Sequence, residues 1–281
     1  MKKIIAVILS VVMLVSCFSV ISFADEEKPL SYVVLGDSIA YGSGLANPVD
    51  ACYGRIVADT NSYTYANHSI PGITSGVLLS MLKDREEVRA SVSDADIISI
   101  SIGGNNFLTD NLIGLAFSSL VGKDMTKFDE IATLYYEDLC TIMDIINELN
   151  PDAVVLLQTI YNPQKGAAGV VYLEGGIRLN DMMRKYDAEH PGEIVIVEVA
   201  EALNGDSENF ADDMIHPSKK GNEKIAVVIL DKLFEMGLGT ATEPVISTPG
   251  LDFKMPISFA FIINVICELF ALFSNLINPL K

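Results

Sequence analysis

The chain has 281 residues, of which 50% are hydrophobic and 20% are charged, so it is not a disordered chain and suits one domain with extensions. Its formal net charge of −18 argues against nucleic acid as a partner, because binding phosphates depends on Lys and Arg. The four cysteines are too widely spaced to indicate a disulfide framework or a zinc site, although a Cys52–Cys140 bridge stays open; they are Cys17, Cys52, Cys140 and Cys267.

Residues 1–24 have the pattern of a signal peptide. Two lysines precede an uncharged apolar run over Ile4–Phe23, and a small-x-small pattern ends at Ala24. We expect cleavage after Ala24, which leaves the domain secreted or at the extracellular cell surface and moves the formal charge from −18 to −20 by removing the two lysines. The alternatives are lipidation of Cys17, which ends a lipobox-like Leu-Val-Ser-Cys, and a retained membrane anchor.

Residues 25–239 form one predicted domain, in which short apolar runs alternate with helical patterns. Nearly continuous apolar runs are typical of strands buried in a parallel sheet, and their alternation with helices indicates a doubly wound α/β domain. Sites in such sheets form at the carboxyl ends of the strands. We expect strands over Tyr32–Leu35, Tyr63–Ala66, Ile97–Ile102, Ala153–Leu157 and Ile194–Val197, and helices over Phe128–Leu149, Tyr172–His190 and Lys219–Met236, the last capped by Ser218.

Polar motifs follow the first three predicted strands. Gly36-Asp37-Ser38 follows the first, Asn67-His68-Ser69-Ile70-Pro71-Gly72 the second, and Gly103-Gly104-Asn105-Asn106 the third. A serine at a strand end faces the crevice, and a glycine N–H or an asparagine side chain there can donate to a developing negative charge. Each motif alone is more typical of an ordinary turn than of a catalytic site.

A late loop, Asp213-Met214-Ile215-His216-Pro217, carries a carboxylate and an imidazole three positions apart. A serine hydroxyl is a poor nucleophile until a base takes its proton, and histidine is the usual base. A carboxylate can hold the imidazole in one tautomer. The other two histidines are His68, in a loop, and His190, at a predicted helix end; each alone is more typical of a surface or structural residue.

Taken together and in this order, the motifs resemble those of SGNH hydrolases of the GDSL type, over about Ser31 to Met236. That family is named for four sequence blocks, and this chain carries all four. The resemblance implies a three-layer α/β/α, doubly wound, mostly parallel sheet of the flavodoxin-like kind. The family often has aspartate after the asparagine of its third block, where this chain has Asn106.

The resemblance also implies roles for individual residues. Ser38 matches the nucleophile, His216 the base and Asp213 the carboxylate that orients it, so these are the expected catalytic residues. The expected oxyanion hole consists of Ser38, Gly72 and Asn105. No Gly-x-Ser-x-Gly elbow occurs, and Ser43, between two glycines, is expected in a loop beside the nucleophile.

These roles predict a serine ester hydrolase that needs no cofactor. Its substrate would be a carbohydrate O-acetyl group or a short acyl ester; the alternative is a lipase or lysophospholipase at a membrane surface. An alternative hypothesis from a different functional class is a non-catalytic surface-binding protein with the same fold. Asp212, Asp213 and His216 could coordinate a cation, but no second histidine lies at ligand spacing, so we expect no metal.

The C-terminal part of the chain is predicted as a linker over 240–256 and an apolar segment over 257–281. Ile257–Leu280 is long enough to span a bilayer. A carboxylate within a spanning helix is expensive, however, so membrane contact, docking on the domain and contact between copies all stay open, as does the oligomeric state. The polar stripe is Asn264, Glu268, Asn275 and Asn278, and the opposite face is Ile262, Ile266, Leu269, Phe273, Leu276 and Leu280.

Overall fold

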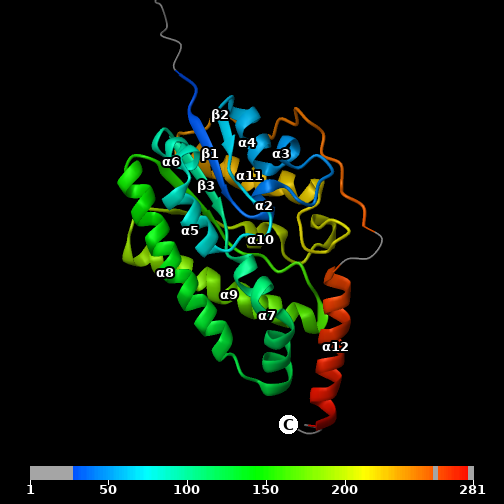
Figure 1. Ribbon diagram of the computed structural model, residues 1–281. Helices are drawn as coiled ribbons and strands as arrows, with labels where there is room; N and C mark the ends of the chain where they lie inside the picture. The colour runs from blue at the N-terminus through cyan, green and yellow to red at the C-terminus, as the bar shows by residue number, and fades with distance from the viewer. Residues whose placement is uncertain (1–27, 256–258, 278–281) are drawn as a thin grey trace, which may run out of the picture.

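The structure, a computed structural model, describes residues 28–255 and 259–277, so the predicted signal peptide lies outside the described residues (Figure 1). The described chain contains all of the expected strands, which form one parallel sheet in the order β2-β1-β3-β4-β5. The chain adds β2 on one side of β1 and then β3, β4 and β5 on the other side. The strand order therefore switches between β1 and β3, and sites in such sheets form at this switch point. The strands are β1 (Ser31–Gly36), β2 (Thr64–Asn67), β3 (Ile97–Ser101), β4 (Val154–Gln158) and β5 (Val195–Val197).

The three predicted helices are present as α8 (Thr126–Leu149), α9 (Gly166–Glu189) and α11 (Lys219–Glu235). Ser218 caps α11 as expected, since its Oγ accepts a hydrogen bond from the N–H of Gly221 at 3.2 Å. The helix α9 begins at Gly166 rather than Tyr172. Its first turns contain glycine and valine, which favour helix weakly, and small alanines that give no apolar periodicity, so sequence alone placed the start too late.

The remaining helices are short or carry weak patterns and were not predicted individually. They are α2 (Ser38–Tyr41), α3 (Pro48–Ala51), α4 (Tyr53–Asn61), α5 (Ser75–Asp84), α6 (Glu86–Ser93), α7 (Gly104–Phe117), the π-helical turn η1 (Ser118–Gly122), α10 (Val199–Leu203) and the 3-10 turn η2 (Ser207–Asn209). The apolar segment predicted over 257–281 contains α12 (Phe259–Ile277).

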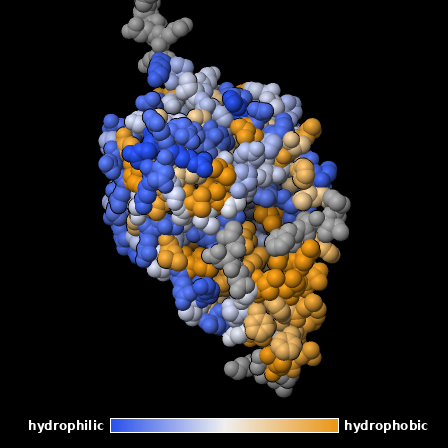
Figure 2. Space-filling model, viewed as in Figure 1, coloured by the Kyte–Doolittle hydropathy of each residue, from blue (hydrophilic) through white to orange (hydrophobic). Residues whose placement is uncertain are grey.

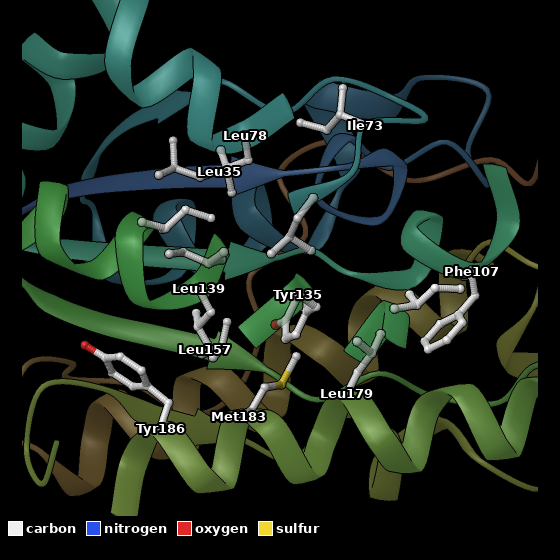
Figure 3. Close-up of a cluster of buried hydrophobic side chains, with 14 of the residues drawn as sticks. Leu35, Ile73, Leu78, Phe107, Tyr135, Leu139, Leu157, Leu179, Met183 and Tyr186 are labelled. Carbon is white, nitrogen blue, oxygen red and sulfur yellow. The ribbon is translucent and has the colours of Figure 1, made fainter. Parts of the chain in front are cut away.

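Two hydrophobic cores lie on opposite faces of the sheet and make the three layers. Along β1 the side chains alternate, so Val33 and Leu35 face one core while Tyr32 and Val34 face the other. The first core is closed by α5 to α9, and Figure 3 shows Leu35 and Leu157 of the sheet facing Leu139 of α8 and Met183 of α9. The second is closed by α4, α10 and α11. The predicted three-layer α/β/α fold is thereby confirmed.

Residues 240–255 form no helix and cross the domain as an extended strap. The N–H of Ala46 donates to Leu251 O at 2.7 Å, and the N–H of Phe253 donates to Gly44 O at 3.0 Å. Asp252 accepts from the N–H of Lys219 at 2.6 Å, at the start of α11. These bonds fix the end of the strap to the domain, and its beginning is held where the N–H of Thr240 donates to Asn61 Oδ1 at 2.8 Å.

The helix α12 lies alongside α7, η1 and α9, as the red helix in Figure 1 shows. By length and composition, Ala260–Ile277 could cross a bilayer. One face of the helix is nevertheless packed on the domain, where Ala260, Ile263 and Cys267 are buried. The polar stripe takes part in this contact, since Glu268 accepts a hydrogen bond from the N–H of Ala167 at 2.8 Å. Asn278 and Leu280 lie outside the described residues.

Cys52, Cys140 and Cys267 are all free thiols, so the Cys52–Cys140 bridge left open by the sequence is not formed. Cys52 and Cys267 are buried, and Cys140 is half-buried on α8. Cys17 lies outside the described residues.

Candidate active site

The hydroxyl of Ser38 is placed by a tight connection between β1 and α2. Gly36 ends the strand at a φ of 142°, and a Cβ there would meet the carbonyl oxygen of Ser101 on β3, so a glycine is required for the close approach. Asp37 caps α2, because its Oδ1 accepts from the N–H of Ile39 at 2.9 Å. Ser38 therefore begins a helix at the carboxyl edge of the sheet.

His216 reaches this serine from the loop before α11. Its Nε2 lies 2.8 Å from Ser38 Oγ, and its Nδ1 lies 2.6 Å from Asp213 Oδ2. An ionised carboxylate only accepts, so Nδ1 carries the proton and Nε2 faces the hydroxyl with its lone pair. This is the arrangement in which an imidazole can take a proton from a serine. The structure thus brings together three of the residues singled out from sequence.

Asp213 is held by more than the imidazole. Its Oδ1 accepts from the backbone N–H groups of Ile215 and His216, both at 2.9 Å. Burial acts to raise the pKa of the Asp213 carboxyl, but the hydrogen bond from His216 and these backbone groups outweigh it and hold the pKa below its ordinary value. The group therefore stays an anion beside the imidazole.

Gly72 and Asn105 lie beside the same cavity as Ser38. Gly72 has a φ of 84°, in the left-handed region that favours glycine. The side-chain Nδ2 of Asn105 donates to Ile73 O at 3.0 Å and to Asp37 Oδ2 at 3.3 Å. Burial raises the pKa of Asp37 to about 6, although the backbone N–H of Ile39 and the charge of His216 act against the shift.

Asn106, the departure from the family pattern, has structural partners of its own. Its Oδ1 accepts from the N–H of Ser75 at 3.1 Å, and its Nδ2 donates to Ser75 Oγ at 2.7 Å. That hydroxyl donates in turn to Asp138 Oδ2 at 2.5 Å. The negative charge missing at position 106 is thus carried by Asp138 on α8.

Other residues weighed from sequence lie elsewhere. Asp212 pairs with Lys254 at 3.4 Å, and within the described ranges no cluster of three or more acidic, His or Cys side chains could hold a metal ion. His68 Nε2 lies 2.8 Å from Ser91 Oγ, and His190 stacks on Tyr186. Ser43 does line the cavity beside the nucleophile, as expected.

A cavity of about 420 Å³ opens at Ser38 and His216 and extends under α7 and α9. Beyond the reactive groups its walls are mainly apolar or small side chains, including Phe107, Leu112, Phe128, Val171, Tyr172 and Gly175. A Cβ on Gly175 would come within 3.0 Å of the Phe107 ring, so this glycine keeps the helices close. These wall residues were not predicted from the sequence, because they are spread over three helices; the Gly175-Gly176 pair inside α9 was the available signal.

A parallel sheet with a serine and an imidazole meeting at its carboxyl edge fits the class of SGNH-type ester hydrolases. The chain belongs to the GDSL-like lipase/acylhydrolase family, whose model matches residues 34–224. The resemblance seen in the sequence is confirmed, and the protein is a carboxylic ester hydrolase. No curated protein matches the chain by sequence.

Solved structures of lipases and esterases share the fold. A lipase from a goat rumen metagenome, Lip_vut3, has a TM-score of 0.59 and 23% identity over 75% of this chain and 98% of its own. A phospholipase A1 from Streptomyces albidoflavus NA297 has a TM-score of 0.54 and 18% identity over 72% of this chain and 98% of its own. An extracellular lipase from Streptomyces rimosus has a TM-score of 0.54 and 18% identity over 71% of this chain and 98% of its own.

Proposed function

We propose that the chain hydrolyses acyl esters with Ser38 as nucleophile, His216 as general base and Asp213 as the residue that orients His216. The hydroxyl attacks the ester carbonyl while Nε2 of His216 takes its proton. The same imidazole then protonates the departing alcohol, and water releases the acid from the acyl-serine by the reverse sequence of proton transfers. The hydrogen bonds from Asp213 through His216 to Ser38 carry this proposal.

The oxyanion of each tetrahedral intermediate would rest on the N–H groups of Ser38 and Gly72 and on the side chain of Asn105. The position of all three beside the cavity supports this assignment. The bond from Asn105 to Asp37 is long, at 3.3 Å, and is the one we expect an oxyanion to replace. The bond to Ile73 at 3.0 Å keeps the amide oriented during the exchange.

The cavity favours an acyl chain over an acetyl group as the part of the substrate bound beside Ser38. An acetyl group would leave most of a 420 Å³ space lined by Phe107, Leu112 and Val171 unfilled. Burying each further methylene is worth up to about 0.8 kcal/mol, or roughly fourfold in binding. We therefore propose a lipase or lysophospholipase type of substrate rather than a carbohydrate O-acetyl group.

A series of nitrophenyl esters from acetate to decanoate, with acetylated xylan beside it, tests both proposals. We expect kcat/KM to rise several-fold for each two-carbon step until the cavity is full, and Ser38→Ala to abolish turnover with every ester. Fluorophosphonate should label the wild type at Ser38. A preference for acetate would overturn the substrate class, and absence of labelling would favour a non-catalytic binding protein.

The exposed face of α12 supports a location at a lipid surface. Apart from Glu268 and Asn275, the exposed and described side chains of α12 are apolar. The helices α7 and α9, which wall the acyl cavity, extend this surface with further exposed apolar residues (Figure 2). Spanning the bilayer would break the bonds of Asn264 and Glu268 to the domain, whereas resting on the surface keeps them. The face consists of Phe261, Ile262, Val265, Leu269, Leu272, Phe273, Leu276 and Ile277 on α12, Ile113 and Phe117 on α7, and Val170, Leu173 and Ile177 on α9.

We propose that the protein, exported by the signal peptide over residues 1–24, rests on a membrane through this face. The mature chain should float with phosphatidylcholine vesicles, and Leu272→Glu should weaken that binding. Leu134→Glu is the matched control, because Leu134 on α8 and Leu272 are both 59% exposed. Self-association without vesicle binding, abolished by Leu272→Glu, would instead assign the face to a second copy.

A further inference from the structure

The loop that carries Asp213 and His216 contains a backbone conformation that needs support. Met214 has a φ of 59°, a left-handed conformation that is uncommon for a residue with a side chain. Within the loop, the N–H of Ala211 donates to His216 O and the N–H of Met214 donates to Ala211 O, both at 2.9 Å. These bonds close the loop but leave the carbonyl groups of Met214 and Ile215 pointing toward a neighbouring segment.

That neighbouring segment, residues 160–165 between β4 and α9, holds both carbonyl groups. The hydroxyl of Tyr161 donates to Ile215 O at 2.9 Å. Desolvation raises the pKa of Tyr161 well above its ordinary value, so this hydroxyl stays a donor. The side-chain Nε2 of Gln164, which is 7% exposed, donates to Met214 O. The conformation that places His216 is therefore fixed from outside its own loop.

A glutamine amide can be turned either way, so something must select the orientation that points Nε2 at Met214. Asn264 on α12 does this, because its Nδ2 donates to Gln164 Oε1 at 2.6 Å. The same Nδ2 donates to Ala260 O at 3.0 Å, one turn earlier on the helix, which identifies the nitrogen end of the Asn264 amide. One turn later, Glu268 accepts from the N–H of Ala167 and holds the helix in place. The order of donors thus runs from α12 through Gln164 to the His216 loop.

We propose that Gln164 is a positioning residue for His216 and that Asn264 sets its orientation, so that the docked helix α12 is a working part of the active site. This inference rests on the proposed roles of Ser38, His216 and Asp213. It assigns α12 a second role besides lipid contact: through Asn264, the side of the helix that packs on the domain controls the alignment of the His216 imidazole. Small misplacements of a catalytic base are costly, up to about a hundredfold in rate for 1 Å.

The decisive variants distinguish the direction of the amide from simple loss of a contact. Asn264→Asp replaces the donor by a carboxylate, so Gln164 must turn its Nε2 toward α12 and present Oε1 to Met214 O. Asn264→Ala only releases Gln164. We expect kcat for a soluble butyrate ester to fall about tenfold or more in Asn264→Asp and less in Asn264→Ala. The KM should stay near that of the wild type, and fluorophosphonate labelling of Ser38 should slow in step with kcat.

Asn275→Asp is the matched control, since it makes the same chemical change at an exposed position of the same helix. Gln164→Met keeps the length of the side chain, removes both hydrogen bonds and should resemble Asn264→Asp in kcat. Wild-type kcat in Asn264→Asp, or equal losses in it and Asn275→Asp, would overturn the positioning role. The proposed function fails separately, if Ser38→Ala keeps its activity. If Asn264→Asp does not fold, the same kcat and labelling measurements on Gln164→Met decide.

Discussion

Asn106 on α7 and Asp138 on α8 meet at a single hydroxyl, that of Ser75, which accepts from the first and donates to the second. This shared hydroxyl shows how the chain does without the aspartate that its family often has at position 106: the carboxylate lies on Asp138 instead. It also couples the residue next to Asn105 to the long helix α8 and to the start of α5.

Restoring the family residue alone should therefore destabilise the protein. In Asn106→Asp the Ser75 hydroxyl faces two carboxylates with one proton, and the cost should be about 1–3 kcal/mol in the free energy of unfolding. Asn106→Asp combined with Asp138→Asn should recover most of the loss, because the donor and acceptor are exchanged. Denaturant unfolding of the single and double variants measures the coupling, and simple additivity would contradict it.

Asp213→Asn should lower kcat by a factor on the order of 10⁴ with little change in KM. The Oδ1 of the new amide can keep both backbone N–H bonds, so its NH₂ group must face Nδ1 of His216 and selects the wrong tautomer. Asp212→Asn is the neighbouring control and should keep its activity, since Asp212 pairs with Lys254 away from the imidazole. Steady-state kinetics suffice, and equal effects at the two positions would refute the assignment of Asp213.

Val171→Phe should shorten the acyl chain that the enzyme prefers. Val171 is 2% exposed and lines the cavity, so the larger ring occupies space that we assign to the chain. We expect kcat/KM for decanoate to fall tenfold or more while that for butyrate changes little. Val170→Phe, at a 45% exposed neighbour on the outer side of α9, provides the control. An unchanged chain-length profile in Val171→Phe would mean that the acyl group binds elsewhere.

Asp37 should make stability depend on pH in a particular direction. Burial raises its pKa in the folded protein to about 6, above the value near 3.9 in an unfolded chain, so the folded state binds the proton more tightly. The Asp37 carboxyl therefore contributes up to about 3 kcal/mol to the free energy of unfolding. This contribution is fully present below about pH 4 and is lost as the pH rises through 6.

Unfolding measured from pH 4 to pH 7 in wild type and Asp37→Asn isolates this contribution. The stability of the variant relative to the wild type should increase over that range, because the other titrating groups are common to both. Ser38→Ala, which keeps the carboxyl group, should follow the wild-type profile. A constant difference between wild type and Asp37→Asn would show that Asp37 titrates with an ordinary pKa.

The sequence predicted the sheet well because its strands are nearly continuous apolar runs that end at glycine or polar motifs, as β1 does at Gly36. Four motifs far apart along the chain could be assembled because the carboxyl ends of parallel strands share one edge. The predicted start of α9 was wrong by more than a turn. The structure has Glu268, from the far end of the chain, accepting from the N–H of Ala167 in the first turn, a contact that the sequence does not reveal.

Gln164 and Asn264 could not be found in this way. Gln164 belongs to no motif, and Asn264 was singled out only as part of the polar stripe of the C-terminal segment. Their relation exists only because α12 docks on the segment before α9. The acyl cavity could not be predicted either. Its walls come from residues such as Phe107 and Val171, which in the sequence have the pattern of ordinary core positions of separate helices.

The separation of Ser38 and His216 by 178 positions also governs when the protein becomes reactive. Ser38 begins α2, the first helix of the described residues, while His216 lies just before α11. A chain whose synthesis has stopped before position 216 has the serine but lacks the histidine that we propose as its base. On that proposal, ester cleavage begins only after most of the domain has been made, which limits early damage to the lipids of the cell that makes the protein.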